Sequence, residues 1–214
     1  MIRGKAIATD KHIKFAHTIS QTIDLSAEER GTGIAKRTPG YIEAKIKNGN
    51  AVIALDGEKF AGFCYIETFG DKNFVVHSGL IVHPDFRNQG LAKKIKTKVF
   101  KYSQEKYPKS KIFGITTGLA VMKINYELGY KPVTFSELTD DPEFWKGCQT
   151  CRNYDVLQRT QQKMCLCTGM LYDGKKDEEK KHPYDSKSLS RLKRIKQSLF
   201  LKKNNQHKNN SNKS

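Results

Sequence analysis

The spacing of apolar residues predicts alternating strands and helices along much of the chain. Near the N-terminus, Asp10 is a suitable N-cap for a helix whose apolar side chains recur at helical spacing. A glycine-rich stretch ending near Pro39 then interrupts regular structure before a second short helix. The elements predicted in this part are a strand over residues 3–9, a helix carrying Ile13, Phe15, Ile19 and Ile23, and a helix over residues 41–47.

Three apolar runs follow and are typical of consecutive antiparallel strands. A polar turn at residues 56–59 joins the first two, as in a hairpin. Pro84 cannot donate to a strand ladder, so the third strand should end near His83, and Gly129 fits the C′ position of a later helix. The predicted elements are strands over residues 51–55, 60–68, 74–82, 111–116 and after Pro132, and helices over residues 90–107 and 119–128.

This order of elements indicates a mixed α/β fold. Strands in a run, followed by strands that alternate with helices, form one sheet with helices packed against it. The later segment is less regular, with a helical turn predicted at residues 142–145 and a strand at residues 164–172. With 214 residues, 37% of them hydrophobic, the chain can bury the core of one compact domain.

The net charge of +17 is concentrated at the C-terminus. Residues 174–214 contain 13 Lys or Arg against 4 Asp or Glu, and their Lys-, Asn- and Ser-rich composition predicts a largely disordered tail. Within it, Leu189, Leu192, Ile195 and Leu199 recur at the spacing of a basic amphipathic helix. Nucleic acid is one partner for such a helix, but a solvated extension is the commoner role of a charge run.

The first residues and the hydropathy of the chain predict a cytoplasmic protein. The N-terminus lacks the apolar run of a secretory signal, and no stretch is long and apolar enough to span a membrane. The five cysteines also fit a reducing compartment better than a disulfide framework.

The segment with the most specific chemistry is an Arg-x-x-Gly-x-Ala motif between a strand and a helix. A turn at a helix N-terminus presents successive backbone N–H groups to an anion, and a glycine lets a phosphate approach closely. The motif therefore predicts a pyrophosphate site. Its residues are Arg87, Asn88, Gln89, Gly90, Leu91 and Ala92.

The motif and its surroundings resemble the acetyl-CoA signature of the GNAT superfamily of N-acetyltransferases, over about residues 2–133. The resemblance implies a GNAT-like fold, with a central, mostly antiparallel, twisted sheet flanked by helices, and acetyl-CoA as cosubstrate. It also implies that the backbone of Ile81 and Val82 pairs with the pantetheine arm. The expected reaction is attack of a neutral primary amine on the thioester, for which the amine must lose a proton and the leaving thiolate must gain one.

Glu67 and His77, on strands beside the expected cleft, are candidates for the base, although a hydrogen-bonded edge histidine is the commoner role for His77. Glu67 is predicted near the end of a strand beside the cleft, where a carboxylate can act as a base through water, although a solvated carboxylate fits the position equally well. Many family members carry a Tyr four residues before the glycine that closes the fourth helix. Here Asn125 occupies that position and Tyr126 follows it, about 100 degrees further round the helix. The proton donor to the thiolate therefore stays open.

The loop between the first two helices usually faces the acceptor in this family. Here it contains Lys36 and Arg37, whose charges suit a carboxylate, although a solvated basic loop is an equal alternative. With the late cysteines, this loop also resembles a bacterial GNAT subgroup linked to amino-acid N-acylation in the arginine pathway. The resemblance implies a small-molecule acceptor such as an acidic amino acid.

Four late cysteines form two close pairs: Cys148 and Cys151, then Cys165 and Cys167. Four thiolates in two pairs are one way to hold a structural Zn²⁺, but the second pair is spaced unusually for such a site. Reduced structural thiols and a redox pair are the alternatives.

Three segments are expected: a GNAT catalytic domain over residues 1–135, a cysteine-containing extension packed on it over residues 136–173, and the basic tail over residues 174–214. The expected function is N-acetyltransfer from acetyl-CoA to the amine of a small molecule. A protein or peptide N-acetyltransferase and a nucleic-acid- or ribosome-associated acetyl-CoA-binding module are the alternatives, and a homodimer is one expected assembly.

Overall fold

The computed structural model describes residues 4–31 and 35–174. Within them, seven strands form one sheet in the order β1-β2-β3-β4-β5-β7-β6, and only the β4–β5 pair is parallel. The mixed, mostly antiparallel sheet predicted from the sequence is therefore confirmed. The strands are β1 (Gly4–Ile7), β2 (Ala51–Asp56), β3 (Lys59–Phe69), β4 (Phe74–Val82), β5 (Lys111–Thr116), β6 (Lys131–Val133) and β7 (Thr168–Tyr172).

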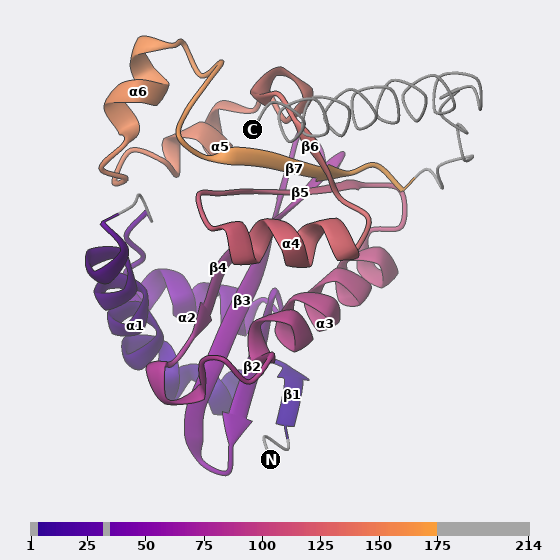
Figure 1. Cartoon of the computed structure of the whole chain (residues 1–214). Helices are drawn as coiled ribbons and strands as arrows, with labels where there is room; N and C mark the ends of the chain where they lie inside the picture. Colours follow the sequence, from indigo (N-terminus) through magenta and orange to yellow (C-terminus); the bar gives the residue numbers. More distant parts are fainter. Residues whose placement is uncertain (1–3, 32–34, 175–214) are drawn as a thin grey trace, which may run out of the picture. The chain divides into compact units, whose positions relative to one another are not determined.

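Helices cover both faces of this sheet (Figure 1). The helices α1 and α2 pack on one face, and α3 packs on the other, where Leu91, Ile95 and Val99 fill the core. The α-helices are α1 (Ala16–Arg30), α2 (Pro39–Lys47), α3 (Leu91–Lys106), α4 (Leu119–Glu127), α5 (Pro142–Lys146) and α6 (Tyr154–Arg159). Short 3-10 helices are η1 (Asp10–Phe15), η2 (Pro84–Phe86) and η3 (Phe135–Glu137).

The first predicted helix begins differently from the expectation. Thr9, not Asp10, is the N-cap, and it caps the 3-10 helix η1 in a reciprocal arrangement with His12. The backbone N–H of Thr9 donates to His12 Nδ1 at 2.9 Å. Helix α1 then starts at Ala16 and ends at Arg30, with Gly31 in the left-handed conformation after it.

A β-bulge in β4 sets the geometry of the central sheet. Phe63 pairs with Ile81 and Tyr65 with Ser78, so β4 carries one more residue than β3 over this interval. Gly79 within the bulge has φ +61°, and a Cβ there would come within 2.8 Å of Tyr65 Cδ1. Only glycine therefore fits this position without strain.

The bulge lies where β4 and β5 separate. Their parallel pairing is limited to three pairs and ends at Val76 and Phe113. Beyond this point β5 turns away from β4, as Figure 1 shows, and residues on both strands line a cavity between them. This confirms the GNAT-like arrangement of the sheet.

The segment predicted as an extension contributes directly to the sheet. Strand β7 inserts between β5 and β6 and pairs antiparallel with both. The connection from β6 to β7 carries η3, α5 and α6, and its aromatic residues Phe135, Phe144 and Trp145 form a core of their own with Phe113 and Leu171. We call residues 134–167, which connect β6 to β7, the cap.

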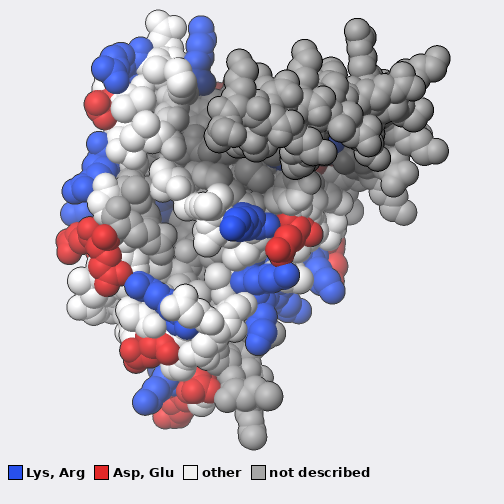
Figure 2. Space-filling model, viewed as in Figure 1, with Lys and Arg blue, Asp and Glu red and all other residues white. Residues whose placement is uncertain are grey.

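Some predictions lie outside the described residues. The basic tail and its amphipathic helix over Leu189 to Leu199 fall in residues 175–214. Within the described part, no helix is both long and apolar enough to cross a membrane. On the face seen in Figure 2, Lys and Arg side chains of the described residues are interspersed with Asp and Glu.

We expect Gly79→Ala to destabilise the fold more than Gly57→Ala. Both glycines have a positive φ, which disfavours alanine by roughly 1–2 kcal/mol, but a Cβ at Gly57 meets nothing within 4 Å. At Gly79 the clash with Tyr65 adds roughly 1–3 kcal/mol. Urea unfolding of the two variants measures the difference, and equal losses would show that the bulge accommodates a side chain.

Candidate active site

The predicted cofactor loop lies between the end of β4 and the start of α3. Gly90 is the N-cap of α3 with φ +71°, and Asn88 also has a positive φ of 61°. The first N–H groups of a helix have no partner within the helix, and in α3 the N–H of Lys94 is the first to reach a carbonyl, that of Gly90 at 3.2 Å. A Cβ at Gly90 would meet nothing within 4 Å, so this turn is open to a ligand. These features suit an anion.

The side chains of the loop have other contacts. Arg87 reaches α1, where Nη1 donates to Glu29 at 2.9 Å and Nη2 to Ser26 at 3.0 Å. Leu91 is buried in the core below α3. The residues from Arg87 to Ala92 therefore present their backbone, rather than these two side chains, to a phosphate, and their role in cofactor binding stays a prediction.

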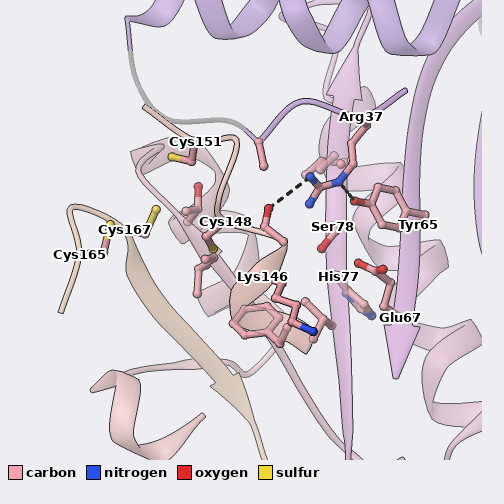
Figure 3. Close-up of a pocket in the computed structure, with 18 of the residues that line it drawn as sticks. Arg37, Tyr65, Glu67, His77, Ser78, Lys146, Cys148, Cys151, Cys165 and Cys167 are labelled. Carbon is pink, nitrogen blue, oxygen red and sulfur yellow. Dashed lines mark hydrogen bonds between the residues drawn. The ribbon is translucent and has the colours of Figure 1, made fainter. Parts of the chain in front are cut away.

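A cavity of about 560 Å³ lies between the separated strands and the cap (Figure 3). Residues 76–80 of β4 and 115–117 at the end of β5 form two of its walls, and α5, α6 and the four late cysteines form another. Ile81 and Val82 are not among the residues that line it, although they continue the same strand. Their predicted pairing with pantetheine would lie just outside the cavity.

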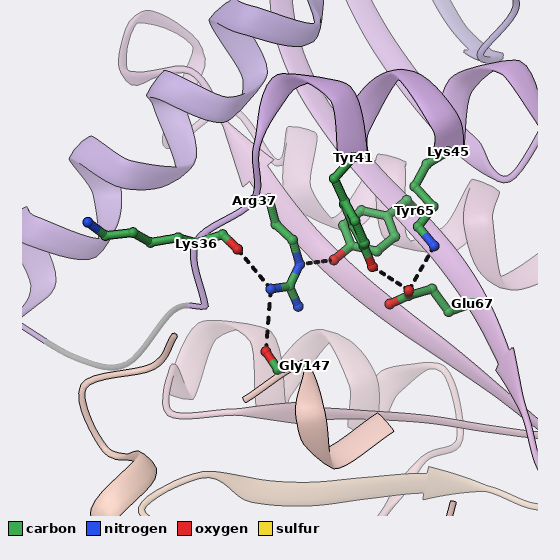
Figure 4. Close-up of polar contacts among 7 residues, drawn as sticks. All are labelled: Lys36, Arg37, Tyr41, Lys45, Tyr65, Glu67 and Gly147. Atoms are coloured by element: carbon green, nitrogen blue, oxygen red, sulfur yellow. Dashed lines mark hydrogen bonds and ion pairs between the residues drawn. The ribbon is translucent and has the colours of Figure 1, made fainter. Parts of the chain in front are cut away.

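Arg37 projects into this cavity from the segment before α2. Its Nε donates to Tyr65 Oη at 2.7 Å, and its Nη1 donates to the carbonyls of Lys36 at 3.0 Å and Gly147 at 3.4 Å (Figure 4). Burial acts to lower the pKa of Arg37, but Tyr65, Tyr41 and Glu67 raise it more, so the guanidinium stays charged. Among the described residues no carboxylate pairs with it.

The predicted base, Glu67, lies on β3 and lines the same cavity. Its Oε1 accepts a hydrogen bond from Tyr41 and another from Lys45 Nζ at 2.8 Å. Burial, with Tyr65 and Glu67 nearby, raises the pKa of Tyr41, so this phenol stays neutral and donates. In the described part of the chain Oε2 has no hydrogen-bond partner, which leaves one carboxylate oxygen for a ligand or a water.

Lys36 is separated from Arg37 despite their adjacency in sequence. Its side chain is exposed and points away from the Arg37 guanidinium (Figure 4), and it lines a neighbouring depression instead of the cavity. Its backbone N–H donates to Thr150 Oγ1 of the cap at 3.0 Å. The structure thus brings together Arg37 and Glu67, and not Lys36.

Asn125 is buried on α4, with 1% of its surface exposed, and it does not line the cavity. Its Oδ1 has no hydrogen-bond partner among the described residues. Tyr126 beside it is 71% exposed, in agreement with the expected rotation around the helix. A catalytic role of Asn125 stays a prediction.

The four late cysteines all face the cavity, but the structure does not support the predicted zinc site. No group of three or more His, Cys, Asp or Glu side chains in the described part could hold a metal ion. Cys165 and Cys167 precede β7 rather than lying on it, and burial raises the pKa of Cys148 to about 11 and that of Cys167 to about 12.

Sequence reasoning missed three polar residues of the site. Tyr41, Lys45 and Tyr65 surround Arg37 and Glu67, and all three look like ordinary members of amphipathic elements in the sequence. A signal was present in the spacing of Tyr41 and Lys45, which lie four residues apart and so share one side of α2.

Residues 19–118 match the sequence model of the Acetyltransferase (GNAT) family. This segment is just under half of the chain and includes Arg37, Glu67, both separated strands and the whole cofactor loop. Over that segment the chain is similar to GNAT acetyltransferases. The match supports the class of enzyme predicted from the Arg87 to Ala92 motif. No curated protein is significantly similar in sequence.

Solved structures that resemble this chain are distant in sequence. N-acetylglutamate synthase from Neisseria gonorrhoeae, complexed with coenzyme A and N-acetyl-glutamate, is 16% identical with a TM-score of 0.56 over 81% of this chain and 35% of its own. This chain thus spans about a third of that synthase. Rv2747 from Mycobacterium tuberculosis, in complex with CoA, is 12% identical with a TM-score of 0.58 over 80% and 99% of the two chains.

A third similar structure is diaminobutyrate acetyltransferase EctA from Paenibacillus lautus, in complex with L-2,4-diaminobutyric acid and coenzyme A. It is 10% identical with a TM-score of 0.55 over 83% of this chain and 99% of its own. At such identities the likeness concerns the GNAT fold.

Proposed function

We propose that this protein transfers an acetyl group from acetyl-CoA to the primary amine of a small molecule that carries a carboxylate, such as an acidic amino acid. The observation that carries the proposal is Arg37, a charged guanidinium inside the cavity whose Nη2 has no hydrogen-bond partner among the described residues. A planar guanidinium matches a carboxylate in shape and charge. Lys146, which lines the same cavity, is a second cation for an acceptor with two carboxylates.

Two features on the β4 side of the site suit acetyl-CoA: the N-terminus of α3 and the separated strand β4. The N-terminus of α3 takes the pyrophosphate through backbone N–H groups, and the separated strand β4 offers main-chain groups to the pantetheine arm. The acetyl group then reaches the cavity through the gap between β4 and β5. The similar structures from Neisseria, Mycobacterium and Paenibacillus are complexes with coenzyme A, which supports acetyl-CoA as the cosubstrate.

Glu67 has the position of the base that prepares the acceptor amine. Its carboxylate lines the cavity with Arg37, so an acceptor held by its carboxylate can direct its ammonium toward Glu67. Tyr41 and Lys45 fix Oε1 and leave Oε2 for the ammonium or for a water that relays its proton. The neutral amine then attacks the thioester carbonyl.

The cap favours a small acceptor over a peptide. It contacts the segment between α1 and α2 at two points: Thr150 accepts from the backbone of Lys36, and Arg152 donates to the carbonyl of Gly31 at 3.1 Å. A peptide groove would need this side to be open. The bound amino-acid ligands named for the Neisseria synthase and for EctA support the same choice.

A panel of acceptors tests the function. We expect CoA release from acetyl-CoA with amino acids, glutamate among them, and none with simple alkylamines that lack a carboxylate. Gly90→Glu should abolish it, because a carboxylate at the open turn repels the pyrophosphate, whereas Gly57→Glu, at an equally open positive-φ glycine in the β2–β3 turn, should not. CoA release at the parental rate by Gly90→Glu would contradict the assignment of the loop.

Arg37→Met should raise the KM for the acceptor about 10- to 100-fold, because one charge-assisted hydrogen bond is worth roughly 1.5–3 kcal/mol. The KM for acetyl-CoA should stay unchanged. Lys36→Met is the matched control, since it removes the neighbouring charge outside the cavity. Initial rates at varied acceptor concentration measure the acceptor KM of both variants. An equal rise in the two variants would show that the net positive charge of the segment, and not a direct contact of Arg37, attracts the acceptor.

Glu67→Gln should lower kcat by about 100-fold or more with little change in either KM, since the amide keeps the shape of the side chain and loses the proton acceptor. Glu43→Gln on α2, which pairs with Lys47 at the surface, is the control. Circular dichroism should show that both variants are folded. A folded Glu67→Gln with parental kcat would assign the proton to bulk water.

A further inference from the structure

One lysine side chain is buried in the core on the α3 side of the sheet. Lys96 is 2% exposed, and no carboxylate or hydrogen-bond acceptor in residues 4–31 and 35–174 contacts its Nζ. Its Nζ lies over the face of the Tyr130 ring, 5.2 Å from the ring centroid. A single cation–π contact offsets only part of the cost of burying an ammonium. Burial accordingly lowers the pKa of Lys96 to about 8.

The Lys96 ammonium lies at the point where β4 and β5 separate. Val76 and Phe113 form the last pair of the two strands, so His77 and Gly114 are the first residues beyond it. A Cβ built on Gly114 would lie 3.2 Å from the His77 carbonyl oxygen and 3.9 Å from Lys96 Nζ. The cavity that holds Arg37 opens from the same separation, on the α1–α2 face of the sheet.

A second buried side chain with an unpartnered polar atom belongs to a residue that contacts the backbone of Tyr130. Asn125, on α4, accepts a hydrogen bond from the backbone N–H of Tyr130 through its carbonyl, while its side-chain Oδ1 has no partner in the described part. Lys96 and Asn125 thus supply an unused donor and an unused acceptor on two helices that meet at Tyr130. Buried groups of this kind are rare unless a ligand completes them.

We propose that Lys96 contacts the sulfur of the bound CoA thioester and donates the proton that the thiolate takes up as it leaves. Asn125 Oδ1 accepts from an amide N–H of the pantetheine arm. This inference rests on the proposed function. Lys96 would take the role of proton donor that a tyrosine has in many family members, at the position where this chain has Asn125.

The acceptor nitrogen forms a bond to the thioester carbon, the carbon–sulfur bond breaks, and its electron pair stays on sulfur. A proton passes from the Lys96 ammonium to sulfur and yields the CoA thiol, while the proton from the acceptor amine leaves through Glu67. The neutral Lys96 amine then regains a proton from water.

The groups around Lys96 do not titrate in the same pH range. Burial raises the pKa of Cys64 on β3 to about 11 and raises that of Tyr130 well above its usual value. Burial, with the charge of Lys96, lowers the pKa of His77 on β4 well below its usual value. A loss of activity as the pH rises through about 8 therefore reports the deprotonation of Lys96.

The test compares Lys96→Met with Lys98→Met, an exposed lysine on the same helix. Methionine replaces the buried charge by an apolar chain of similar length, so the fold should be retained or stabilised. We expect Lys96→Met to lose about 100-fold in kcat, to keep its KM for acetyl-CoA, and to lack the decline of kcat above pH 8 that the parent and Lys98→Met show. Parental kcat and pH profile in folded Lys96→Met would overturn the proposal.

A second measurement needs no acceptor. A cation beside the sulfur favours the thiolate, so ultraviolet titration of CoA bound to the parent protein should show a thiol pKa about one unit below that of free CoA. Lys96→Met should remove this shift. Bound CoA with an unshifted thiol overturns the role of Lys96 alone, whereas a parent protein that binds no CoA overturns the proposed function itself.

Discussion

The structure depends on the early end of the pairing between β4 and β5. Backbone N–H and C=O groups in a sheet interior need partners, and strands that diverge after Val76 and Phe113 leave such groups facing a gap. Gly79 makes this possible, because the bulge at this residue shifts β4 relative to β3 in a conformation that a side chain would disrupt. The cavity, the access of the thioester and the position of Lys96 all follow from that divergence.

The charges of the cavity are unequally compensated. Glu67 is balanced by Lys45 and held by Tyr41, so it is fixed in place before any ligand binds. Arg37 is fixed by neutral groups alone, the Tyr65 hydroxyl and two carbonyls, and its charge stays uncompensated within the described residues. A half-buried cation held this way is stabilised by an anionic ligand, which favours the proposed carboxylate-bearing acceptor.

Local sequence signals predicted the elements and the turn before α3 well, because both depend on nearby residues. The period of Leu91, Ile95 and Val99 defines α3, and Gly90 defines its start. The acceptor side could not be predicted in the same way. Its contacts join residues far apart in sequence, such as Arg37 with Gly147, and the thiols of Cys148 and Cys167 share a wall without forming a metal site.

The burial of Lys96 could not be predicted from the sequence. Lys96 is one of several lysines on α3, and its burial follows only from its place between Ile95 and Val99 on the face toward the sheet. An apolar residue there would give a more stable core, since burying an ammonium costs several kcal/mol that the Tyr130 ring returns only in part. Natural sequences tolerate such local costs chiefly at functional sites. The position of Lys96 at the separation of β4 and β5 indicates which site this is: the place where the carbon–sulfur bond breaks.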